Sequence, residues 1–176
     1  MVPVLITAWK RPSKVKRLIS RLREIAPEKV FAACDGPSSV ADSIKVEETR
    51  RIIESEIDWP CELYTLFNET NLGCRMGMTK AINWFFTNVE EGIILEDDCI
   101  PHYEFFQFCT ELLERYRNNE RIFSISGNNF QDSQWRGDGS YYLSQYFHCW
   151  GWASWRRSWN KFDSNLQSWE SLKEFN

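Results

Sequence analysis

The hydrophobic positions of this chain alternate between two patterns up to residue 126. Short apolar runs that are rich in β-branched residues predict buried strands. Between these runs, apolar residues recur every three or four positions opposite charged ones, which is typical of amphipathic helices. This alternation predicts an α/β fold, with a mostly parallel sheet and helices on both faces. The expected strands cover residues 2–7, 29–34, 61–67, 92–95 and 122–126.

Residues that start or stop helices separate these segments. Ser13 follows Arg11-Pro12 and is predicted to cap the first helix, which Pro27 ends. Asn71-Leu72-Gly73 leads into a later helix. The spacing of apolar residues also predicts which faces of the last three helices are buried. They hold Ile44, Ile52 and Ile53; Met78, Ala81, Ile82, Phe85 and Phe86; and Tyr103, Phe106, Cys109, Leu112, Leu113 and Tyr116.

Composition and charge narrow the class of protein. With 176 residues, 43% of them hydrophobic, the chain is long enough to bury a core as a single domain. Its formal net charge of -4 provides no basic field, so we expect no nucleic-acid partner. The six cysteines include no C-x-x-C pair, which argues against a zinc site. Buried thiols in a reducing compartment are the simpler account.

Targeting signals are not recognisable in the sequence. Neither a secretory leader nor an apolar run of membrane-spanning length is found. We therefore expect a cytoplasmic protein without a transmembrane segment, with peripheral membrane association left open. The oligomeric state is not predicted.

One apolar run leads directly into three consecutive carboxylates. Residues 92–95 are followed by Glu96, Asp97 and Asp98, whose like charges require a counter-charge at neutral pH. Side chains alternate along a strand, so Glu96 and Asp98 are expected to share one direction and Asp97 to take the other. One carboxylate can then face a metal ion while its neighbour faces a ligand hydroxyl. The alternative is an ordinary polar turn at the end of a buried strand.

Polar residues that end the predicted strands are expected to meet in one crevice. In parallel sheets, ligands bind beyond the carboxyl ends of the strands, where the strand order reverses. Mg²⁺ or Mn²⁺ there would be held by one or two carboxylates plus phosphate oxygens. Arg11 could form two contacts with phosphate, Asp35 could accept from a base or ribose, and Arg75 begins a helix nearby. Taken singly, each of these could equally be a solvated loop or turn residue.

Five stretches of the chain match a known family in the same order. The chain resembles glycosyltransferases of the GT-A fold, which is Rossmann-like, and most closely the N-acetylglucosaminyltransferase I family and bacterial nucleotide-diphospho-sugar transferases. The acidic triplet, which is similar to the D-x-D motif, is the most specific match. The stretches are P-V-L-I-T-A-W-K-R from Pro3, A-A-C-D-G from Ala32, I-L-E-D-D-C-I-P-H-Y-E-F-F from Ile94, I-S-G-N-N from Ile125 and G-W-A-S-W from Gly151.

The resemblance implies a reaction and a division of the chain. A sugar would pass from a nucleotide-diphosphate donor, a UDP-sugar, to a glycan or lipid-linked acceptor, with Mn²⁺ or Mg²⁺ and with inversion. Residues 1–176 would form a single domain. Its residues 1–130 would bind the donor, and 131–176 would begin the acceptor-binding part.

Site residues follow from the same resemblance. Asp98 would contact the metal, Arg11 the donor phosphates and Asp35 the nucleobase. Glu96 and Asp97 would serve ribose, water or contacts behind the metal. The predicted donor-binding set is Thr7, Arg11, Asp35, Arg75, Glu96 and Asp97.

The tail after His148 is rich in tryptophan. Aromatic faces suit sugar rings, so Gly151 and Trp152 are predicted to bind the acceptor. Burial of a final amphipathic segment accounts for most of these indoles equally well.

An inverting transferase also needs a carboxylate base within reach of the acceptor hydroxyl. In the related enzymes an aspartate follows a tryptophan beyond the stretch that matches Gly151-Trp152, and this sequence contains no Trp-Asp pair. We therefore expect a C-terminally incomplete chain, with the base beyond Asn176. Asp163 and Glu170 are the possible substitutes within it.

Two other functions stay open at this point. A nucleotide-sugar or glycan-binding module could keep the fold without a working base. A sugar nucleotidyltransferase usually has a glycine-rich loop after the first strand, whereas residues 8–11, Ala-Trp-Lys-Arg, contain no glycine. Turnover of donor in the presence of acceptor would separate enzyme from binding module.

Overall fold

The computed structural model describes residues 1–131, 134, 137–167, 169 and 173. The strands in these residues are β1 (Val4–Ala8), β2 (Lys29–Cys34), β3 (Glu62–Phe67), β4 (Glu91–Glu96), β5 (Ser124–Ser126) and β6 (Trp152–Trp155). The helices are α1 (Pro12–Ile25), α2 (Val40–Glu56), α3 (Gly73–Asn88), α4 (Tyr103–Tyr116) and α5 (Arg156–Trp159). None of the described helices is long and apolar enough to cross a membrane.

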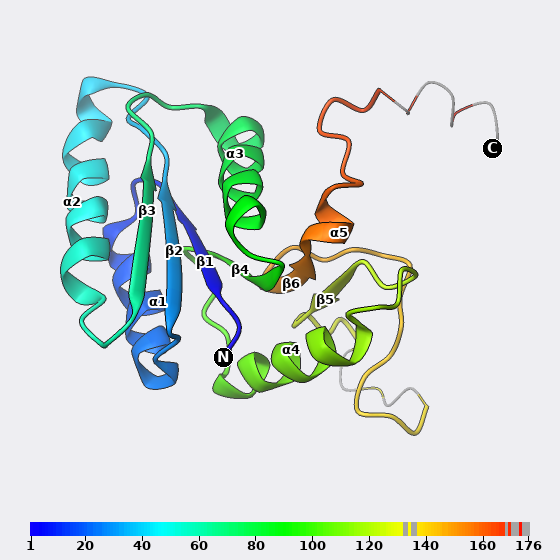
Figure 1. Ribbon diagram of the computed structural model, residues 1–176. Coiled ribbons are helices and arrows are strands. Elements are labelled where there is room, and N and C mark those ends of the chain that lie inside the picture. Colours follow the sequence, from blue (N-terminus) through cyan, green and yellow to red (C-terminus); the bar gives the residue numbers. More distant parts are fainter. Residues whose placement is uncertain (132–133, 135–136, 168, 170–172, 174–176) are drawn as a thin grey trace.

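All six strands join one sheet in the order β3-β2-β1-β4-β6-β5 (Figure 1). β1 pairs in parallel with β2 and β4, and β2 pairs in parallel with β3. β6 runs antiparallel between β4 and β5. The predicted α/β class with a mostly parallel sheet is confirmed.

Helices cover both faces of the sheet, as the sequence predicts (Figure 1). Along the central strands, alternate residues point to opposite sides. Ile6 and Leu95 belong to a core that includes the inner faces of α1, α2 and α4. Leu5 and Ile94 belong to a second core, built against α3. The central strands are buried on both faces, which explains why their sequences are continuous apolar runs.

Helix starts and faces differ from expectation in three places. α1 begins at Pro12 with Arg11 at the N-cap, so Ser13 is not the cap; proline is favoured at the first helical position because its φ is already helical. Ile44 is 77% exposed and Tyr103 is 53% exposed. The rest of each predicted face is largely confirmed, because Ile53 in α2 is buried, as are Phe106, Cys109, Leu112 and Leu113 in α4. The same helices also bury Val46, Thr49 and Phe105, which were not predicted.

β6 is the strand that the sequence pattern does not reveal. Its four residues, W-A-S-W, are all buried, so they show neither the alternation of a half-buried strand nor a long apolar run. The strand inserts between β4 and β5, which are themselves connected through α4. A segment beyond residue 130 is therefore part of the same sheet as the N-terminal strands.

The strand order reverses beside β1. The chain passes from β1 to β2 and β3 on one side, and then crosses back to place β4 on the other side. Thr7 of β1 lies in register with Glu96 of β4, so both strands end at this point. In open α/β sheets a ligand crevice forms at such a switch point.

Candidate functional site

The acidic residues form a tight turn at the end of β4. The backbone N–H of Cys99 donates to the carbonyl oxygen of Glu96 at 2.9 Å and closes it. Within this turn the side chain of Asp97 is 1% exposed, whereas that of Asp98 is 39% exposed. Glu96 is half-buried. The three carboxylates therefore differ sharply in their access to solvent.

Arg11 supplies a counter-charge from within the chain. Its Nε donates to Asp97 Oδ2 at 3.1 Å, its Nη1 donates to Asp98 Oδ2 at 2.7 Å, and its Nη2 forms an ion pair with Asp97 Oδ1. The side chain is 47% exposed. A guanidinium has more N–H groups than these contacts use, so part of it stays available to another anion.

Burial and like charge disturb the pKa values in this turn. Burial lowers the pKa of Arg11, but its attraction to Asp97 and Asp98 outweighs that effect and leaves the pKa raised. Burial raises the pKa of Glu96, and repulsion from Asp98 and Asp97 raises it further. Burial also raises the pKa of Asp97, against the opposing effect of Arg11. An added cation would relieve the remaining repulsion.

Asp35, which follows β2, fastens the loop that leads into α3. Its carboxylate accepts hydrogen bonds of 2.9 to 3.2 Å from that loop and from its own neighbour. A carboxylate offers about four lone-pair sites, so these contacts use most of its capacity. The nucleobase contact that we predict for Asp35 stays a prediction. The donors are the backbone N–H groups of Gly36, Leu72 and Gly73 and the side-chain amides of Asn68 and Asn71.

A small cavity of about 230 Å³ brings most of the predicted donor residues together. It lies where β1, β2 and β4 end, against α3. Trp9, Leu66 and Met78 are among the residues that make its wall largely apolar. The predicted residues that line it are Thr7, Arg11, Asp35, Glu96 and Asp97.

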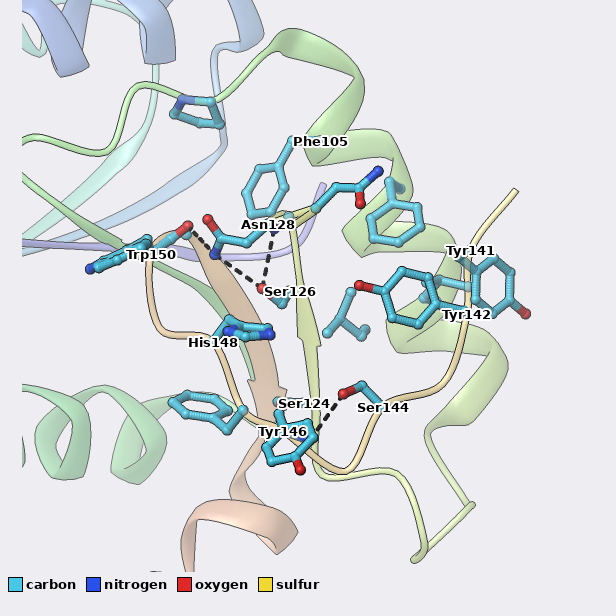
Figure 2. Close-up of a pocket in the computed structure, with 18 of the residues that line it drawn as sticks. Phe105, Ser124, Ser126, Asn128, Tyr141, Tyr142, Ser144, Tyr146, His148 and Trp150 are labelled. Atoms are coloured by element: carbon cyan, nitrogen blue, oxygen red, sulfur yellow. Dashed lines mark hydrogen bonds between the residues drawn. The ribbon is translucent and has the colours of Figure 1, made fainter. Parts of the chain in front are cut away.

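A second, wider groove of about 1300 Å³ receives the third carboxylate of the turn. Asp98 and Cys99 line it together with α4, β5 and the segment 140–151. Figure 2 shows the rings of Tyr141 and Tyr142 on one side of β5 and those of His148 and Trp150 on the other. The acidic turn therefore contributes side chains to both cavities.

The other predicted site residues lie in different surroundings. Gly151 lines the wide groove. Trp152 is 6% exposed and belongs to the α3-side core, where its indole contacts the ring of Phe147, so an acceptor contact by Trp152 stays a prediction without support from its burial. Arg75 donates to the carbonyl oxygen of Ser164 at 3.4 Å and is not among the described residues that line either cavity.

Neither candidate base is among the described residues that line the cavities. Asp163 accepts a hydrogen bond from the backbone N–H of Asn165 at 3.1 Å and lies in a turn after α5, outside both described cavity linings. Glu170 lies outside the residues that the structure describes. A base therefore remains unassigned.

Metal binding depends on whether the carboxylates can act together. No group of three or more His, Cys, Asp or Glu residues in the described part of the chain is arranged to hold a metal ion. Asp98 offers one half-exposed carboxylate, and Asp97 is held by Arg11. Divalent ions are often bound by one or two carboxylates plus phosphate oxygens. The residues present fit a divalent ion only if a bound ligand completes its coordination.

Some residues that line the cavities are not among those predicted from the sequence. Asn68 and Asn71 line the small cavity, and Asn68 directly follows β3, so the strand-end rule applied to β3 would have found it. Gly77 lines the same cavity, and a Cβ there would lie 3.3 Å from Asp35 Oδ2. The wide groove takes most of its aromatic residues from 141–150. The density of rings in that stretch is the signal that could have indicated it.

Comparisons with known proteins do not identify a family for this chain. No protein-family model and no curated protein matches the sequence. A solved structure with some likeness is the 4-diphosphocytidyl-2C-methyl-D-erythritol synthase from Anaerococcus prevotii DSM 20548. It is 8% identical, the match covers 97% of this chain and 84% of that one, and the TM-score is 0.49. A likeness of this size carries no argument about function.

Proposed function

We propose that this chain is a metal-dependent glycosyltransferase of the GT-A type, which moves a sugar from a UDP-sugar to an acceptor hydroxyl. The observation that carries the proposal is that one acidic turn serves two cavities, with Glu96 and Asp97 lining the first and Asp98 the second. A transferase must bring two substrates together at one set of charged groups. The resemblance of the acidic triplet and its flanking stretches to glycosyltransferases supports the same reaction.

The donor would bind with its nucleoside in the small cavity. At about 230 Å³ this cavity is smaller than the roughly 300 to 1,000 Å³ typical of whole-ligand pockets, so it suits one part of a donor. Its apolar wall suits a base and ribose. The diphosphate would then extend towards the exposed part of Arg11 and towards Asp98, where charge is concentrated.

A divalent ion would be held by Asp98 and the donor's phosphate oxygens, and when bound it would neutralise charge on the departing diphosphate. Arg11 would orient the phosphates through its remaining N–H groups. Glu96 would accept a hydrogen bond from a donor hydroxyl. Asp97 would hold Arg11 in place, since its carboxylate contacts the guanidinium and is buried.

Calorimetry with UDP and with uridine tests the donor site. In the presence of Mn²⁺, Arg11→Ala should lower the affinity for UDP by about tenfold or more, because a charge-assisted contact to phosphate is lost. The affinity for uridine should change much less. Arg17→Ala, an exposed arginine on α1, is the matched control. An equal loss of UDP and uridine affinity in Arg11→Ala would refute the phosphate role.

The metal is tested through Asp98. Asp98→Asn should abolish the dependence of UDP affinity on Mn²⁺ while the protein stays folded, because the amide removes the anionic ligand. A folded variant with unchanged metal dependence would remove Asp98 from the metal site.

Product analysis separates the three candidate functions. Release of UDP with a glycosylated acceptor marks a glycosyltransferase. Pyrophosphate released from a nucleoside triphosphate and a sugar phosphate marks a nucleotidyltransferase. Binding of UDP-sugar without any product marks a binding module.

A further inference from the structure

We propose that the wide groove binds a neutral oligosaccharide, with Trp150 as a stacking surface for one of its sugars. This inference rests on the proposed function and names the class of its acceptor. Of the two acceptor classes expected from the sequence, the wide groove would take an uncharged glycan and not an acceptor linked to lipid through a diphosphate.

The charges that line the groove favour an uncharged ligand. Among the described lining residues Arg121 is the only arginine or lysine, while Asp98 and Glu104 contribute carboxylates. Phosphate and carboxylate ligands are recognised by arginine and lysine, often through paired contacts. Away from the acidic turn, a diphosphate or an acidic sugar would meet only one cation among the described lining residues, and Glu104 would repel it.

Many of the residues that line the groove are aromatic. Trp150 is 62% exposed and Tyr146 is 80% exposed. The ring of Phe130 lies 4.8 Å from that of His148 and 6.1 Å from that of Trp150, measured between centroids. Exposed apolar surface of this kind marks a binding site, and the C–H faces of sugars are a suitable partner for aromatic rings.

Hydrogen bonds hold the main chain at Trp150 in place before any ligand arrives. Asn128 Nδ2 donates to the carbonyl oxygen of Trp150 at 2.9 Å (Figure 2). The backbone N–H of Gly127 donates to the carbonyl oxygen of Gly151 at 3.1 Å. Gly151 has a φ of 78°, a left-handed conformation that favours glycine. This bend separates the indoles on either side of Gly151, because Trp152 is buried while Trp150 faces the groove. Because the main chain is already fixed, binding would cost only the side-chain entropy of the indole.

The size and the polar groups of the groove suit several sugar units. Its volume of about 1300 Å³ exceeds the roughly 300 to 1,000 Å³ typical of small-ligand pockets. Ser124, Asn129 and Ser140 add hydroxyl and amide groups among the rings. Asp98 lies on the lining, so one end of a bound oligosaccharide would reach the acidic turn.

Binding of defined oligosaccharides tests the inference without requiring turnover. The probes are maltotetraose, cellotetraose, mannotetraose and chitotetraose, with tetragalacturonate as the acidic probe and farnesyl diphosphate as the lipid diphosphate. Calorimetry should show that at least one neutral probe binds and that both charged probes bind more weakly. Trp150→Ala should lower the affinity for the neutral probe by about tenfold, and Trp150→Phe should keep most of the wild-type affinity.

Three further measurements guard against a folding artefact. UDP affinity in the presence of Mn²⁺ should be unchanged in Trp150→Ala, which also shows that the variant is folded. Tyr146→Ala should weaken the neutral probe independently. Tyr64→Ala removes an exposed ring on β3, outside the described lining of the groove, and should leave binding of the probe unaffected.

Failure of the inference is distinguishable from failure of the proposed function. If UDP binds but no neutral probe does, or if a charged probe binds more tightly, the acceptor class is wrong and the donor site stands. If a neutral probe binds with unchanged affinity in Trp150→Ala, the stacking surface is wrong. Absence of UDP binding counts against the proposed function, whereas the oligosaccharide result is judged separately.

Discussion

Within the acidic turn, the three carboxylates are stabilised unequally. Arg11 donates hydrogen bonds to the carboxylates of Asp97 and Asp98, while no residue in the described part of the chain donates one to the carboxylate of Glu96. Glu96 is also half-buried beside two other acids, which raises its pKa. An ionised carboxylate in such surroundings lowers the stability of the fold. The Glu96 carboxylate can still accept hydrogen bonds from a ligand, and residues with pKa values disturbed in this way cluster at functional sites.

The first residue-scale prediction concerns Glu96→Gln and pH. The raised pKa means that the folded protein binds this proton more tightly than the unfolded chain. The stability that protonation of Glu96 contributes is therefore fully present below the ordinary pKa of about 4.3. It is lost as the pH rises through the raised pKa of Glu96 in the folded protein. At about pH 7 the variant should be more stable by about 0.5 kcal/mol, after allowance for solvent screening. The difference should vanish below about pH 4.

Urea unfolding across this pH range measures the difference, with Glu48→Gln on the exposed face of α2 as the control. UDP affinity should fall in Glu96→Gln even though stability rises. A variant that is less stable than the wild type at about pH 7 would contradict the prediction.

At the scale of elements, Asp35 joins the end of β2 to the start of α3. Its carboxylate accepts from the N–H groups of Leu72 and Gly73, which begin the helix. Free N–H groups at a helix start attract anions, so Asp35 occupies a position that a phosphate could otherwise take. The loop after β3 and the wall of the small cavity are thereby held together.

Removal of this carboxylate should loosen the wall of the cavity. Asp35→Ala leaves the N–H groups of Leu72 and Gly73 without their acceptor, and we expect a loss of about 1 to 3 kcal/mol in the free energy of unfolding. Affinity for uridine and for UDP should fall together, because the cavity that both would use is affected. Urea unfolding and calorimetry check this, with exposed Asp138→Ala as the control. Wild-type stability in Asp35→Ala would show that the loop does not depend on the hydrogen bonds to the Asp35 carboxylate.

For the whole molecule, β6 connects the two halves that the sequence suggests. It pairs with β4 on one side and β5 on the other, and it places Trp155 in the core at 2% exposure. The indole Nε1 of Trp155 donates to the carbonyl oxygen of Leu113 at 3.2 Å, which ties β6 to α4. The small cavity and the wide groove are therefore built on one sheet.

A fragment of residues 1–130 should consequently fail to fold cooperatively. It lacks β6, so β4 and β5 lose their shared partner, and the space filled by Trp155 is empty. Loss of a buried tryptophan side chain alone costs about 3 to 5 kcal/mol, a large part of the stability of a typical domain. Near-ultraviolet circular dichroism and urea unfolding are the measurements, and residues 1–163, which keep β6 and α5, are the control. A cooperative transition in the shorter fragment would show that the first half folds alone.

The sequence by itself determined the alternation of strands and helices, and with it the α/β class, because continuous apolar runs and helical spacing are local patterns. It also placed Thr7, Arg11, Asp35, Glu96 and Asp97 at strand ends, and parallel strands bring such ends to one edge. It did not reveal β6, since W-A-S-W has no period of its own.

Only the tertiary structure decided which partners the charged residues take. Arg11 and the acidic turn are separated by more than eighty positions in the chain, and their pairing depends on the register of β1 with β4. In the same way, Trp150 and Trp152 lie only two positions apart and have the same side chain, but their surroundings are opposite. A hydrophobic residue indicates that burial is favourable, but the bend at Gly151 and the pairing of β6 determine which indole is buried.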